Sequence, residues 1–165
     1  MKEYAKRRGF TLVELLIVII VIGILSAMML LSSTEAVSSA RAADIVSDLR
    51  NMKTAALEWY AENIPYVQGK AKDSDGKKFS EVKLSGVKDK IKKYLGNDEI
   101  KSGYSFGDGV DDGTWYAWYE INDARVREKL LNRKDTVGLV GASSGTATSG
   151  GNFVKSSKYV GLFIR

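Results

Sequence analysis

The sequence predicts an α+β protein in which a long N-terminal helix packs on a small, largely antiparallel sheet of about four strands. An apolar run of 22 residues, 10–31, continues into a segment rich in helix formers and free of proline until Pro65. The last part of the chain instead holds short segments rich in aromatic and β-branched residues between glycine-rich turns. With 165 residues and no internal repeat, one globular unit is expected, and we divide the chain into a leader (1–9), the long helix (10–62) and a head (63–165).

The composition excludes several classes of chemistry. The chain has no cysteine and no histidine, which removes disulfides, thiolate and imidazole catalysis and most transition-metal sites. No pair of carboxylates has a spacing that suggests acid–base catalysis, so an enzyme is not predicted. The net charge is +5, and four basic residues against one acid in the leader leave only +2 for the rest of the chain. A nucleic-acid partner is therefore not indicated.

The apolar run 10–31 is the first element of the long helix. As a helix of 22 residues it is roughly 33 Å long, which is enough to cross a bilayer. The basic residues before it predict that the N-terminus stays in the cytoplasm and that the head lies outside. A cleaved signal peptide has a shorter apolar region, and a lipoprotein signal needs a cysteine, but a generic signal anchor fits the length and charge of this run.

Glu14 is the one charged residue in this run. A carboxylate in the hydrocarbon region costs at least a few kcal/mol, and no partner for it is expected within the run itself. Cleavage between Gly9 and Phe10 would create an α-amine one helical turn from Glu14, at the level of the Glu14 carboxylate of a neighbouring copy. Pairing between copies would then favour polymerisation. Protonation of Glu14, or snorkelling toward the interface, is the alternative explanation.

The basic leader, Gly9, Phe10, Glu14 and the long apolar run together resemble the signal of type IV pilins and type II secretion pseudopilins. In these families a prepilin peptidase cuts after the glycine and methylates the new N-terminal residue. The resemblance implies cleavage between Gly9 and Phe10, N-methylation of Phe10, and a role for Glu14 in subunit assembly. One departure is the absence of the proline that many members have well along this helix, near residues 29–31.

This resemblance implies a structural subunit of a type IV pilus-like filament or of a type II secretion pseudopilus. Its expected partners are copies of itself, other pilin-like subunits, the prepilin peptidase, a membrane assembly platform and, before assembly, the lipid bilayer. The expected location is the bacterial inner membrane, with a single span, and then a periplasmic or cell-surface filament. The alternative is a minor pilin whose head acts as a binding module for DNA uptake or adhesion at a filament tip.

The second half of the long helix is amphipathic. Its apolar residues recur at spacings of three and four: Ala42, Ile45, Leu49, Met52, Ala56 and Trp59. The stripe lasts only about two and a half heptads, which favours the spine of the head over a coiled-coil seam. The transmembrane part of the helix is thus expected to end near residue 31, where this pattern replaces the uniformly apolar one.

Four further segments predict the rest of the head. Residues 80–97 suggest a short amphipathic helix with a glycine stop at Gly96, and residues 114–121 form the strongest strand, paired with residues 104–106 in a hairpin. Asn122 or Asp123 is expected to cap a helix that runs to about Arg133, with Val126 and Leu130 inside. Residues 136–141 and 158–164 are the remaining predicted strands.

Two features of the head allow a binding function. Asp108, Asp111 and Asp112 lie between glycines, and some major pseudopilins bind calcium in a loop of the head, so the resemblance implies possible calcium ligands here. Ordinary turn chemistry explains the same residues, and no other cofactor is expected. The aromatic residues in 114–121 alternatively form a stacking platform for bases or sugars, although alternation along a strand places at least half of them in the core.

Overall fold

The computed structural model describes residues 9–63, 84–96, 99–109, 114–142 and 151–165. The chain divides into two compact units, Met1–Val37 and Ser38–Arg165, which are described separately. Helix α1, Leu12–Glu62, contributes to both, and it begins two residues later than predicted. The long N-terminal helix and the small antiparallel sheet confirm the predicted α+β fold class.

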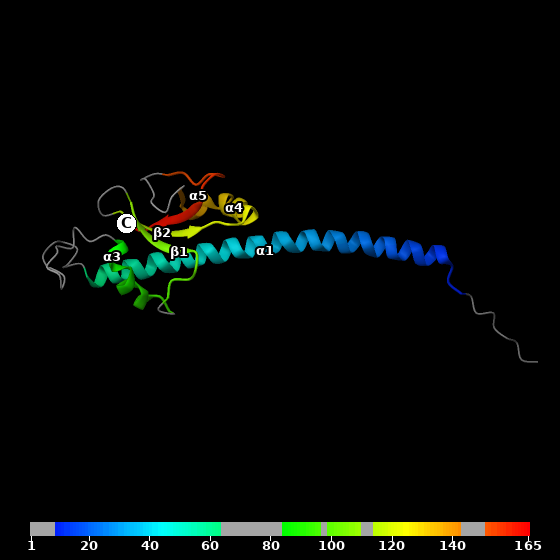
Figure 1. Ribbon diagram of the computed structural model, residues 1–165, viewed down its shortest axis with the longest axis horizontal. Helices are drawn as coiled ribbons and strands as arrows, with labels where there is room; N and C mark the ends of the chain where they lie inside the picture. The colour runs from blue at the N-terminus through cyan, green and yellow to red at the C-terminus, as the bar shows by residue number, and fades with distance from the viewer. Residues whose placement is uncertain (1–8, 64–83, 97–98, 110–113, 143–150) are drawn as a thin grey trace, which may run out of the picture. The chain divides into compact units, whose positions relative to one another are not determined.

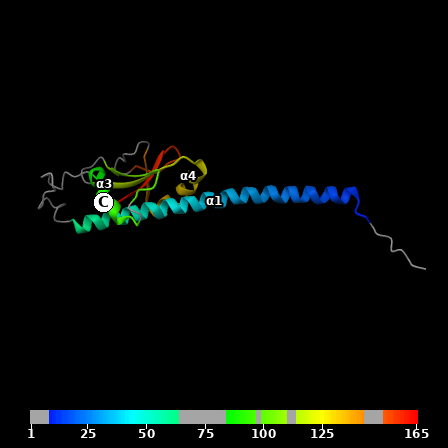
Figure 2. The ribbon, with the colours of Figure 1, turned by 60° about the horizontal axis from the view of Figure 1, so that its bottom comes forward.

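The sheet has four strands in the order β1-β2-β4-β3, and all three pairs are antiparallel. The strands are β1 (Tyr104–Asp108), β2 (Trp115–Glu120), β3 (Leu139–Ala142) and β4 (Tyr159–Phe163). The predicted hairpin is confirmed, because Tyr104 is opposite Tyr119 and Phe106 is opposite Ala117. Figures 1 and 2 both show the sheet lying along the C-terminal half of α1. In the strand order the C-terminal strand β4 lies between β2 and β3.

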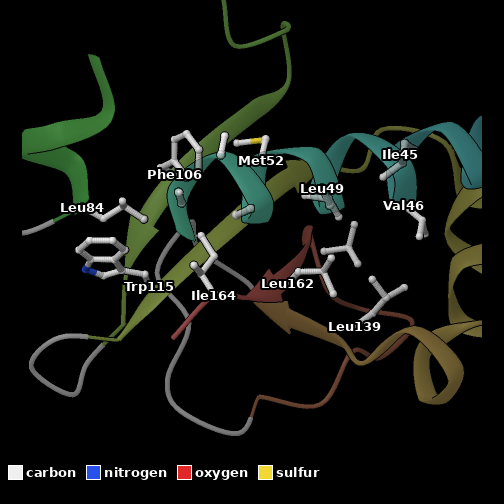
Figure 3. Packing of buried hydrophobic residues seen from close by; sticks show 14 of the residues in the cluster. Ile45, Val46, Leu49, Met52, Leu84, Phe106, Trp115, Leu139, Leu162 and Ile164 are labelled. Carbon is white, nitrogen blue, oxygen red and sulfur yellow. The ribbon is translucent and has the colours of Figure 1, made fainter. Parts of the chain in front are cut away.

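The predicted apolar stripe of α1 is buried against the sheet. Every member of the stripe is at most 5% exposed. Figure 3 shows Leu49 and Met52 of α1 among side chains from several other elements, including Phe106 of β1, Trp115 of β2 and Leu162 of β4. The second half of α1 is therefore the spine of the head rather than a coiled-coil seam within this unit.

Strand β2 places aromatic residues on both faces of the sheet. Trp115 faces α1, with its ring 6.0 Å from that of Trp59, whereas Tyr116 and Trp118 stack on the opposite face with centroids 5.2 Å apart. Three of the four β2 aromatics, Trp115, Tyr116 and Trp118, are at most 3% exposed, and Tyr119 is half-buried. The hypothesis of an exposed stacking platform is therefore wrong for these three residues.

The glycine at position 161 is required by this packing. Trp118 lies opposite Gly161 across the β2–β4 pair. A Cβ at Gly161 would lie 2.3 Å from the Trp118 ring and 2.5 Å from the carbonyl oxygen of Ala117. The indole thus occupies the space that a side chain on β4 would otherwise fill.

Three short helices complete the described part of the head: α3 (Leu84–Ile91), α4 (Ala124–Leu131) and α5 (Lys134–Val137), with a 3-10 turn, η2 (Lys92–Tyr94), after α3. Helix α4 and its cap were predicted correctly, because the Asp123 carboxylate accepts hydrogen bonds from the backbone N–H groups of Arg125 and Val126. The side chains of Val126 and Leu130 are both buried.

Two predicted boundaries in the head were wrong. The helical segment after α3 ends at Tyr94 because Leu95 is already extended, with φ −86° and ψ 129°, so Gly96 is not its stop. The segment 136–141 begins as helix, since its first two residues close α5. Gly138, in the left-handed region at φ 75°, ends that helix, and β3 begins at the next residue, Leu139.

Candidate assembly site at the start of the long helix

Gly9 and Phe10 precede the first turn of α1, and both residues are exposed. Phe10 is 89% exposed, and the Gly9–Phe10 bond lies outside regular structure. A Cβ built on Gly9 meets no atom within 4 Å. The described fold therefore does not itself require glycine at this position. If glycine is needed there, the requirement comes from the enzyme that acts on the bond. Cleavage at this bond and methylation of Phe10 remain predictions.

Glu14 forms a capping box with Thr11, the residue immediately before α1. The backbone N–H and the hydroxyl of Thr11 both donate to Glu14 Oε2, each at 2.8 Å. In return, the backbone N–H of Glu14 donates to Thr11 Oγ1 at 3.2 Å. Thr11 thus occupies the N-cap position and Glu14 the third position of the helix, so two otherwise unpaired N–H groups are satisfied reciprocally.

This arrangement corrects the expectation that nothing within the apolar run provides a partner for Glu14. Thr11 is such a partner, and it was missed although the pattern T-x-x-E before an apolar segment is a readable capping-box signal. All the Glu14 side-chain hydrogen bonds within the described part of the chain go to Oε2. Within the described residues, no hydrogen bond reaches the other carboxylate oxygen, Oε1.

The surroundings of Glu14 in the first unit are apolar. Every large apolar side chain from Leu12 to Leu30 is exposed, and each is at least 48% accessible. Among the described residues, α1 is the one helix long and apolar enough to cross a membrane. An apolar surface of this size on all sides of a helix requires lipid or other protein around it.

The predicted calcium ligands are only partly within the described structure. Asp108 ends β1, and its Oδ1 accepts a hydrogen bond from the backbone N–H of Leu84 at the start of α3. Asp111 and Asp112 lie outside the described residues. No group of three His, Cys, Asp or Glu residues placed to hold a metal occurs in the described ranges. Calcium binding by Asp108, Asp111 and Asp112 therefore stays a prediction.

Comparison with protein families identifies a prokaryotic N-terminal methylation motif at residues 4–30. This motif is the prepilin-type signal of type IV pilins and pseudopilins, and its range contains Gly9, Phe10, Thr11 and Glu14. It implies processing by a prepilin peptidase and assembly with other pilin-like subunits. Comparisons with curated proteins and with solved structures give no significant match. The chain therefore carries a prepilin-type signal, and the head has no matched relative in these comparisons.

Proposed function

We propose that this protein is a structural subunit of a type IV pilus-like filament or of a type II secretion pseudopilus. A prepilin peptidase cleaves it between Gly9 and Phe10 and methylates Phe10. Residues 10–31 hold it in the bacterial inner membrane as a single span, with the N-terminus in the cytoplasm, until it joins a periplasmic or cell-surface filament. The observation that carries this proposal is the methylation motif at the start of a helix whose apolar side chains are exposed on every side.

The exposed apolar half of α1 needs two successive environments. Lipid covers these side chains in the anchored subunit, and an assembly machine then has to remove the helix from the bilayer. Returning them to water would cost about 1.5–3 kcal/mol for each large side chain. Identical helices in a filament core avoid this cost, because they bury the same surfaces again. The function is structural, consistent with the motif, and we assign no reaction to the chain.

Glu14 links the membrane-bound and assembled states. Its Oε2 accepts both hydrogen bonds from Thr11, which fixes the carboxylate beside the end of its own helix. Cleavage after Gly9 adds a positive amine at Phe10, and we assign to Oε1 the pairing with the amine of a neighbouring copy. In an apolar surrounding this pair favours the assembled state over an isolated helix that carries an unpaired charge.

A minor pilin that presents its head as a binding module is the alternative. Burial of Trp115, Tyr116 and Trp118 removes three of the four β2 aromatic side chains that such a module was expected to use for bases or sugars. This observation favours a filament subunit over a DNA-binding tip protein. Calcium binding by Asp108, Asp111 and Asp112 would favour the secretion pseudopilus, since some major pseudopilins bind calcium in the head.

The test is the mass of the N-terminal peptide of the protein isolated from its own host. The expected peptide starts at Phe10 and carries one added methyl group. The matched variant Gly9→Val should stay uncut with an unchanged head, because the described fold leaves open space at this position. An intact Met1 start in the unmodified protein would overturn the proposal and leave a signal-anchored domain instead.

A further inference from the structure

A hollow of about 240 Å³ lies in the head between α1 and the connection from η2 to β1. Its polar lining comes from Asp48 and Asn51 of α1 and from Glu99 and Lys101 of the connection. Tyr104, the first residue of β1, adds an aromatic ring to the lining. We call this the α1–β1 hollow. It lies entirely within the second unit, Ser38–Arg165.

Three of the lining groups are already linked to one another. Lys101 Nζ lies 2.7 Å from Asp48 Oδ1 and 2.9 Å from Asp48 Oδ2, so these two charges balance each other. The Tyr104 hydroxyl also donates to the Asp48 carboxylate, and burial together with this hydrogen bond raises the pKa of Tyr104. The Tyr104 ring contacts that of Tyr119, with centroids 4.7 Å apart. The aromatic ring and the ion pair are therefore held in place before any ligand arrives.

Asn51 and Glu99 are the polar lining groups that remain available. Both side chains are exposed, and neither has a hydrogen bond or ion pair within the part of the chain that the structure describes. The Asn51 amide both donates and accepts, and the Glu99 carboxylate accepts. The Lys101 side chain is 63% exposed, and its ammonium group has three N–H donors. The α1–β1 hollow thus offers donors and acceptors together.

The rest of the lining is apolar and consists of Met52, Leu95 and Ile100, apart from one glycine. The volume is below the range of about 300–1,000 Å³ that is typical of pockets for drug-sized ligands, so it suits a single ring. An apolar ring alone would leave Asn51 and Glu99 without hydrogen-bond partners. The ligand therefore needs both an apolar face and polar groups around its edge.

Charge narrows the ligand class further. An anion would meet the Glu99 carboxylate beside a pair that is already neutral. An ammonium group has donors only, so it cannot accept from Asn51 or Lys101. The described ranges hold no group of three His, Cys, Asp or Glu residues placed to bind a metal. A neutral ligand that donates and accepts hydrogen bonds is the class that remains.

We infer that the α1–β1 hollow binds one glucose-type pyranose ring of a neutral saccharide. The ring hydroxyls of such a sugar point outward around the edge, so that both faces of the ring consist of C–H groups. A C–H face packs on Tyr104 and Met52, and the hydroxyls bond with Asn51, Glu99 and Lys101. This inference goes beyond the proposed function, because it concerns the head and depends on neither cleavage nor assembly.

Saturation-transfer NMR on the full-length protein, in a detergent without a sugar head group, measures this binding. The neutral probes are cellotriose and tri-N-acetylchitotriose, and the charged counterpart is cellotriuronic acid. A single bound ring offers few atoms, so we expect a dissociation constant of about 1 mM for a neutral probe and roughly tenfold weaker binding of the acid. Binding of cellotriose indicates a plain glucan as the source, and binding of the N-acetylated probe alone indicates an amino-sugar polymer. Either result supports the inference.

Two lysine substitutions on α1 form a matched pair. Asn51 and Thr54 are both exposed, but only Asn51 lines the hollow. Asn51→Lys should weaken binding of the neutral probe roughly tenfold, because it replaces an acceptor with a long charged side chain. Thr54→Lys should leave binding unchanged. At Tyr104, Phe keeps the ring and should bind within about twofold of the unmodified chain, whereas Leu removes the ring and should lose most of the binding.

Thermal unfolding of each variant shows whether the head is intact. The Asn51 and Thr54 substitutions keep the test valid even if Tyr104→Leu fails to fold, because both of these side chains are exposed. No saturation transfer to either neutral probe, equal binding of the uronic acid, or equal effects of Asn51→Lys and Thr54→Lys would each overturn the inference. None of these results affects the proposed function, which fails only if the unmodified chain is uncut or forms no filaments.

Discussion

The two halves of α1 use apolar residues in opposite ways. From Leu12 to Leu30 every large apolar side chain is exposed, whereas in the second half Leu49, Met52 and Trp59 are at most 4% exposed. The first half is apolar around its whole circumference, and the second half has a single apolar stripe. One half therefore depends on other molecules for its burial, and the other is buried by its own chain.

The largest effect is expected from removing the charge of Glu14, which lies among apolar residues in the exposed half of α1. Glu14→Gln retains a side-chain oxygen that can accept from Thr11, so it keeps the cap while removing the charge. We expect both Glu14→Gln and Glu14→Ala to lower filament yield by roughly tenfold or more, because each removes the charge of the proposed pair with the neighbouring amine. Membrane insertion should be retained or improved, as measured by fractionation.

Thr11→Ser is the matched control, since serine keeps a capping hydroxyl. This variant should form filaments normally. If Glu14→Gln also did so, the capping box alone would account for Glu14, and the pairing between copies would be refuted.

The sequence predicted the parts of the fold that local pattern determines. The long helix follows from a proline-free run with helical periodicity, and the β1–β2 hairpin from aromatic density next to a short turn. The position of β4 between β2 and β3 was not predicted, because it depends on pairing Glu120 with Tyr159 across a long sequence separation. Helix α5 has only four residues, which is too short for a periodic signal.

The candidate site divides in a similar way. Gly9, Phe10 and Glu14 were proposed as site residues because a glycine after basic residues, an acid and a spanning run occur together. Thr11 was missed because it was counted as part of the apolar run, while its hydrogen bonds to Glu14 depend on where the helix begins. A helix that started one turn earlier would leave Thr11 with no capping role.

The second prediction compares the same residue type in the two halves of α1. Leu49→Ala should lower the free energy of unfolding of the head by about 2–5 kcal/mol, because it leaves a cavity beneath the sheet. Leu25→Ala should not change head unfolding, since Leu25 is 56% exposed in the first unit. Thermal or denaturant unfolding in detergent, followed by near-UV circular dichroism of the tryptophans, measures both variants. Equal effects of the two substitutions would contradict the division of the helix.

The third prediction concerns the face of the sheet away from α1. Gly161→Ala should destabilise the head by about 1–3 kcal/mol, because its Cβ would overlap the Trp118 ring. Gly86→Ala in α3 meets no atom within 4 Å and should instead stabilise the head by about 0.5–1 kcal/mol through helix propensity. The same unfolding measurement distinguishes the two signs. If Gly161→Ala left the stability of the head unchanged, the Trp118 indole would have to adopt another position in the variant.

The smallest expected effect on the stability of the head is at Asp123, whose single carboxylate caps α4 at the surface rather than packing in the core. Asp123→Ala should lower stability by about 1 kcal/mol at neutral pH, whereas Asp123→Asn keeps a good N-cap and should be nearly neutral.

The N–H groups of Arg125 and Val126 and the charges of Arg125 and Arg41 hold the pKa of Asp123 below its ordinary value. Because the folded-state pKa is lowered, this contribution is complete above the unfolded-state pKa of about 3.9 and is lost as the pH falls through the folded-state value. The stability difference between the unmodified chain and Asp123→Ala should therefore narrow below about pH 4. A difference that stayed constant through that range would show that the carboxylate charge does not contribute to the cap.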